Sequence, residues 1–64
     1  MTTVDQVNND KSIKFFMNTT NKKKISRMKL SDLALEKYIM FQRSMSVDLA
    51  LIRTDEFLGS WVPV

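Results

Sequence analysis

Five cationic side chains within eight residues are the strongest chemical signal in this sequence, and no acidic residue interrupts them. The five residues are Lys22, Lys23, Lys24, Arg27 and Lys29. Such a stretch can neutralise the phosphates of a nucleic acid, with an affinity that falls steeply as salt rises. It can equally contact an acidic protein surface or remain a solvated, solubilising linker. We therefore take these five residues as candidate contacts for nucleic acid or for an acidic partner.

Catalytic chemistry is not indicated by the remaining residues. The chain has no His and no Cys, and no Ser or Lys lies in a recognisable nucleophile context. The single glycine excludes a phosphate-binding glycine loop. Asp32 and Glu36 are four residues apart on an expected helix, but solvated surface charge explains such a pair more simply than acid–base catalysis. We expect a protein that is not an enzyme, with no cofactor, metal site or small-molecule substrate.

The length of the chain limits how much apolar surface it can bury. A chain of 64 residues buries only about 60% of the surface that its unfolded form exposes. Without Cys or His, neither disulfides nor the usual zinc ligands can stabilise the fold, so self-association or docking on a partner remains. The N-terminus has no signal-peptide pattern, and no run approaches the roughly 20 apolar residues that span a bilayer. We expect a cytoplasmic protein, of the producing or host cell, without membrane contact.

The first half of the chain gives weak local signals. Residues 1–11 are mostly polar and predict a flexible, disordered N-terminal arm, followed by a single small helical domain over residues 12–64. Residues 12–30 form either a hairpin or a helix, because the apolar residues at 13, 15, 16 and 17 suit both periodicities. Residues 18–21 have turn chemistry.

The second half of the chain predicts helix. Residues 31–58 contain neither Gly nor Pro and are rich in strong helix formers. Ser31 is a suitable N-cap, and Gly59 marks the end. Ser46, with Asp48 two positions later, could cap a second helix, so one long helix and two shorter helices both remain open. The expected fold class is therefore mainly α.

An apolar stripe runs along residues 31–58 if they are read as one helix. From Leu35 onward its members recur at spacings of three and four. Some are expected to form the core of a small helical fold, but Met and aromatic residues also suit an adaptable protein-binding face. Trp61 is either a separate binding anchor or a lid over the helices. The candidate protein interface comprises Tyr38, Phe41, Met45, Leu49, Ile52 and Trp61.

Residues 24–58 resemble a ribbon-helix-helix repressor, with a short alternating strand, a cap, a helix, a break and a second helix. In that family two strands pair across a dimer and lie in the DNA major groove. The resemblance implies that Arg27 and Lys29 face DNA while Met28 and Leu30 face the dimer core. Two features depart from the family: the turn between the helices has no Gly, and Asp55 falls near a position where the second helix normally buries an aliphatic residue.

Together these features predict a small accessory or inhibitory regulator of the kind found in phages or mobile elements. It would dock stoichiometrically on a larger protein assembly through an apolar helical face, with the basic stretch as an electrostatic contact. The alternative is a dimeric, ribbon-helix-helix-like DNA-binding transcriptional repressor. A larger protein partner is thus expected, and a homodimer or a nucleic-acid partner are the other possibilities.

Overall fold

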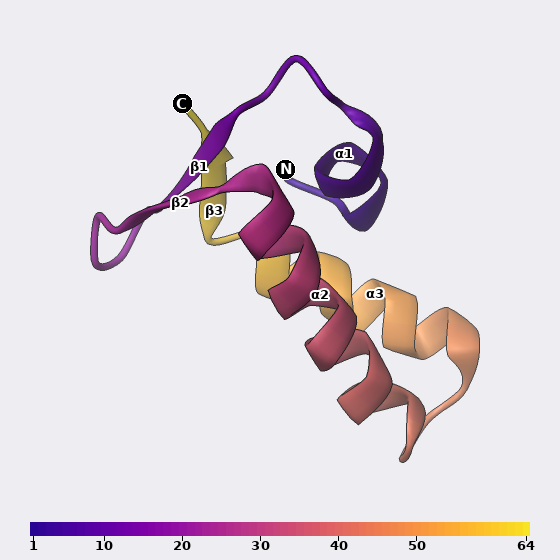
Figure 1. Ribbon diagram of the computed structural model, residues 1–64. Helices are drawn as coiled ribbons and strands as arrows, with labels where there is room; N and C mark the ends of the chain where they lie inside the picture. Colours follow the sequence, from indigo (N-terminus) through magenta and orange to yellow (C-terminus); the bar gives the residue numbers. More distant parts are fainter.

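Three helices and three short strands follow one another in the computed structural model, which describes residues 1–64. In chain order the elements are α1 (Val4–Asn9), β1 (Phe15–Asn18), β2 (Lys24–Ser26), α2 (Arg27–Gln42), α3 (Val47–Leu58) and β3 (Trp61–Pro63). Helices α2 and α3 run antiparallel, side by side, and the sheet lies at one end of this pair (Figure 1). The chain is therefore an α+β domain, whereas the prediction was a mainly α fold with at most a hairpin over residues 12–30.

The sheet is antiparallel, with strand order β2-β1-β3. Of the two structures left open for residues 12–30, the hairpin is correct for β1 and β2, although it ends at Ser26 because α2 begins at the next residue. The carbonyl oxygen of the Asn18 side chain closes the turn by accepting from the backbone N–H groups of Thr20 and Asn21. Strand β3, which was not predicted, adds to the other side of β1.

The predicted flexible arm over residues 1–11 is wrong, because most of this segment is helical and packed. Helix α1 has only six residues, too few to be stable alone in water. Tertiary contacts hold it: Val7 is fully buried, and the Thr2 hydroxyl donates to the carbonyl of Trp61 at 2.6 Å. The N–H of Val4 also donates to the Asp55 carboxylate at 2.8 Å.

Residues 31–58 form parts of two helices rather than one. Ser46 caps α3 by accepting from the N–H of Leu49, as its position suggested. Helix α2 begins earlier than predicted, because Ser26 caps it by accepting from the N–H of Lys29. Ser31 therefore lies inside α2, where its hydroxyl donates to Asn8 of α1. Gly59 ends α3, as predicted.

The core lies between the inner face of the sheet and the helices. Nine of the 64 residues are buried, so the core is small. The buried apolar cluster draws on every helix and on two strands: Val7, Phe16, Leu30, Ala34, Leu58 and Trp61. The indole N–H of Trp61 has no hydrogen-bond acceptor, which is a cost within an otherwise apolar cluster.

Candidate functional site

The predicted protein interface is divided by the turn between α2 and α3. Tyr38 and Phe41 lie four and seven positions after buried Ala34, so they face the core side of α2 and are half-buried. Leu49 and Ile52 lie on α3 and are exposed, Ile52 by 54%. The predicted stripe therefore forms two separate surfaces, one on α2 and one on α3. The prediction read residues 31–58 as one helix, but residues 43–46 form a turn between two helices.

The other two members of that interface are less accessible. Met45 is half-buried in the turn between the helices. Trp61 retains only 8% of its surface and belongs to the core cluster. Trp61 therefore packs within the domain, which matches the lid rather than the free anchor.

An apolar groove lies where α1, α2 and α3 meet, with a volume of about 390 Å³. Exposed Leu35 and Leu51 flank it from α2 and α3, with Tyr38 between the helices. The residues lining this groove are Val4, Asn8, Ser31, Ala34, Leu35, Tyr38, Leu51 and Thr54. Sequence reasoning could not find the groove, because one of its walls is helix α1.

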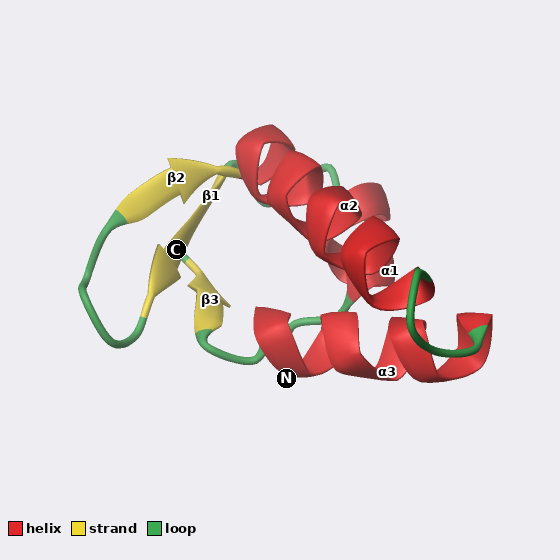
Figure 2. Cartoon of the chain, turned by 90° about the horizontal axis from the view of Figure 1, so that it is seen from below, coloured by secondary structure: helices red, strands yellow, loops and turns green.

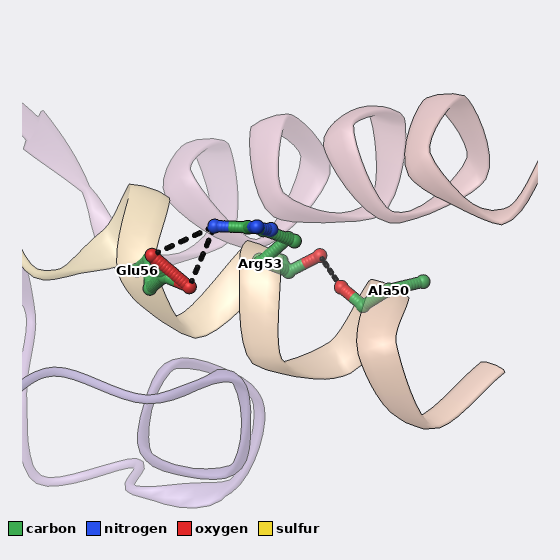
Figure 3. A network of polar contacts seen from close by, with 4 residues as sticks. Ala50, Arg53 and Glu56 are labelled. Atoms are coloured by element: carbon green, nitrogen blue, oxygen red, sulfur yellow. Dashed lines mark hydrogen bonds and ion pairs between the residues drawn. The ribbon is translucent and has the colours of Figure 1, made fainter. Parts of the chain in front are cut away.

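Several of the polar groups at the groove are already bonded within the chain. The Ser31 hydroxyl donates to the Asn8 side chain at 2.6 Å. The buried Thr54 hydroxyl donates to the carbonyl of Ala50 at 2.8 Å, a bond visible in Figure 3. Because these groups are satisfied internally, the groove is suited to apolar side chains rather than to a polar ligand.

The groove continues into a row of exposed apolar residues along α2. Met28, Leu35 and Ile39 are seven and four positions apart, so they share one side of the helix. Their exposed fractions are 72%, 57% and 44%. We call this row together with the groove the docking face. Polar Ser31 and Asp32 lie between Met28 and Leu35 on this side, so the docking face consists of two apolar areas rather than one. Exposed apolar surface of this kind is typical of a site for another protein.

The basic stretch is divided between a free part and a structural part. Lys22 and Lys23 lie in the hairpin turn, Lys24 lies in β2, and Lys29 lies in the first turn of α2; all four are exposed. Arg27 is half-buried, and its guanidinium donates to the carbonyls of Val7 at 3.0 Å and Asn8 at 3.4 Å. A cation at the last carbonyls of a helix is favourable, so this contact of Arg27 stabilises the packing of α1 against α2.

This contact predicts unequal effects of two substitutions in the basic stretch. Arg27→Gln should lower the free energy of unfolding by about 1–2 kcal/mol, because charge-assisted hydrogen bonds to the end of α1 are lost. Lys29→Gln removes the same charge from an exposed side chain and should change stability by less than about 0.5 kcal/mol. Urea unfolding followed by circular dichroism measures both. Equal effects would show that Arg27 is as free as Lys29.

Charge is distributed unevenly over the molecule. Residues 11–29 carry seven basic side chains and no acidic one, whereas residues 30–64 carry five acidic and three basic side chains. The one ion pair joins Arg53 and Glu56 on the exposed side of α3, at 3.3 Å (Figure 3). An exposed pair of this kind contributes little to stability. The cations of the hairpin therefore remain free to act on a partner.

Comparison with models of protein families, with curated proteins and with solved structures finds no match for this chain. No helix combines the length and the apolar character needed to cross a membrane. Two surfaces are candidate contacts: the docking face, and the exposed cations Lys22, Lys23 and Lys24, which we call the basic hairpin.

The ribbon-helix-helix resemblance holds for the order of elements but not for the residues of the strand. A short strand, β2, does precede two helices. However, Arg27 and Lys29 lie in α2 rather than in a strand, and β2 pairs with β1 of the same chain. Leu30 is fully buried in this chain's own core, while Met28 is exposed. The dimeric repressor stays a prediction, which light scattering and binding to duplex DNA would test.

Proposed function

We propose that this protein is a small non-enzymatic accessory or inhibitory protein that binds stoichiometrically to a larger protein assembly. The docking face supplies the affinity, and the basic hairpin supplies an electrostatic contact. The observation that supports this proposal most directly is the exposure of Met28, Leu35 and Ile39 in one row beside an apolar groove.

The exposure of apolar residues is not a sign of loose folding. The accessible surface is 4402 Å², close to the roughly 4,200 Å² expected for a folded monomer of this mass. Even so, eleven large apolar side chains remain exposed. Covering them would be favourable by about 25 cal/mol for each Å² of apolar surface removed from water. The domain is thus well folded and carries apolar surface that another protein can cover.

The free cations favour one orientation of the bound partner. The basic stretch lies at the sheet end of the molecule, and the docking face lies along α2 (Figure 1). Complementary charge mainly accelerates encounter and fixes orientation, while buried apolar contacts slow dissociation. A partner with an acidic region beside an apolar ridge would match both surfaces at once.

Site-specific photo-cross-linking in the producing cell tests the docking face. With p-benzoylphenylalanine in place of Leu35, we expect one dominant adduct with the mass of one copy of this chain plus one partner. The matched control places the same group at Met40, which is also exposed and lies about 140° around α2 from Leu35. We expect that control to give no such adduct.

Two outcomes would contradict the proposal. Equal adducts from positions 35 and 40 would mean that α2 contacts its surroundings without a preferred face. An adduct with the mass of two copies of this chain would mean that the docking face joins two molecules of the protein itself. The Met40 control also separates specific contact from non-specific association, because both positions are exposed apolar residues of the same helix.

A further inference from the structure

The sheet has one face without a helix over it. Figure 2 shows the three helices on one side of the sheet, where Phe16 is fully buried. Side chains alternate between the two faces of a strand, so the neighbours of Phe16 in β1 point to the outer face. These are Phe15, exposed by 44%, and half-buried Met17. Val62 is the Cα partner of Met17 in β3 and shares this face.

Free cations accompany this outer face. Lys24 is the partner of Met17 in β2, and its ammonium nitrogen lies 4.9 Å from the centre of the Phe15 ring. The hairpin turn next to it adds Lys22 and Lys23. No cation of residues 11–29 is in an ion pair, and no acidic side chain occurs in that segment. The face therefore combines an exposed aromatic ring with uncompensated positive charge.

The edges of the sheet are less suited to a ligand than its face. On β3, the carbonyl of Trp61 already accepts from Thr2, and Pro63 has no N–H to offer an added strand. On β2, the edge is three residues long and carries Lys24, and lysine commonly protects an edge from strand addition. A partner of this sheet is thus expected to lie across the outer face.

We propose that the outer face of the sheet binds single-stranded nucleic acid. In the bound state the Lys24 ammonium moves from the Phe15 ring to a phosphate. A base then stacks on the ring, and Lys22 and Lys23 contact further phosphates. Base stacking on an aromatic side chain of an open sheet, combined with a cationic path for the backbone, is a general way to bind single strands. In a duplex the bases are already stacked on one another, so the ring of Phe15 has no base face to meet.

Charge argues against the other occupants of this face. A second copy would bring two identical clusters of cations together, and like charges across an interface are unfavourable. An acidic protein would satisfy the lysines, but it would make no particular use of the planar Phe15 ring. A single strand uses both features. It competes with an acidic region of the protein partner for Lys22, Lys23 and Lys24, but it leaves the apolar docking face of α2 free.

Fluorescence anisotropy with a labelled oligothymidine of fifteen nucleotides tests the proposal. We expect binding at low salt that weakens steeply with added salt. Phe15→Leu and Phe15→Ala should each weaken it roughly tenfold or more, because stacking is lost. Met40→Ala is the matched control, since Met40 is 51% exposed but lies on α2 and outside the docking face. It should bind as the wild type does, and circular dichroism verifies that each variant is folded.

A second matched pair separates local contact from net charge. The Lys37 ammonium lies over the Phe57 ring at 5.3 Å, an arrangement like that of Lys24 and Phe15 but among the helices. Lys24→Ala should weaken binding several-fold, whereas Lys37→Ala, with the same loss of charge, should have little effect. Equal losses of affinity for Lys24→Ala and Lys37→Ala, or full affinity of the Phe15 variants, would overturn the proposal. It would also be overturned if duplex DNA bound as tightly as oligothymidine, or if polyglutamate competed as well as unlabelled oligothymidine.

Discussion

Replacing Trp61 with alanine should unfold a large part of the protein population at room temperature. Trp61 is 92% removed from solvent in the core cluster, and truncating a buried aromatic residue to alanine costs about 3–5 kcal/mol. The whole free energy of unfolding of a domain of this size is about 3–10 kcal/mol. The loss is therefore comparable with the entire stability, and urea unfolding followed by circular dichroism would show it directly.

The matched control for Trp61 is Val64→Ala, a truncation of an exposed apolar residue three positions later. It should change stability by less than about 0.5 kcal/mol. If Trp61→Ala kept full stability but lost its cross-linked partner, then Trp61 would be an interface anchor after all. The indole N–H adds a finer test: it has no acceptor, so Trp61→Phe should cost much less than Trp61→Ala.

The features that could be predicted from the sequence are those specified by local chemistry. A serine hydroxyl that accepts from an N–H three residues later needs no distant residue, and Ser46 caps α3 in this way. Gly59 ends the same helix. The turn at residues 18–21 is also local, since the Asn18 side chain accepts from the backbone N–H groups of Thr20 and Asn21.

The features that were missed depend on residues far apart in the chain. Helix α1 and strand β3 are too short to be specified by their own sequences. The segment before α1 is held to β3 by the bond between Thr2 and Trp61, which are 59 positions apart. Contacts over such a separation leave no periodic pattern in the sequence, so residues 1–11 looked disordered.

The candidate site was predictable only in part for the same reason. Ile52 and the lysines in the hairpin were assigned to candidate contact surfaces from their residue types, and the structure shows them exposed. The groove could not be predicted, because Val4 and Asn8 reach it only through the packing of α1. Arg27 looked like one more free cation, since nothing in the sequence indicates that the last carbonyls of α1 lie within its reach.

Replacing Val7 with aspartate tests whether α1 belongs to the folded domain. Val7 is fully buried in the core cluster, so the substitution places a charge where an apolar side chain packs. The cost should be at least about 3 kcal/mol, because the new carboxylate either loses its hydration or pulls α1 away from the core. Urea unfolding measures the loss, and hydrogen exchange at the amides of residues 4–9 distinguishes detachment of α1 from global unfolding.

The neighbouring substitution Asn8→Asp is the matched control for this experiment. It adds the same charge one residue later on an exposed side chain, and it keeps a carboxylate oxygen as the acceptor for the Ser31 hydroxyl. Its effect should stay below about 0.5 kcal/mol. If both variants were as stable as the wild type, α1 would not contribute to the core. Since α1 forms one wall of the groove, that result would also remove the groove from the docking face. A large loss of stability for Val7→Asp alone would mean that the core and the groove depend on the same helix.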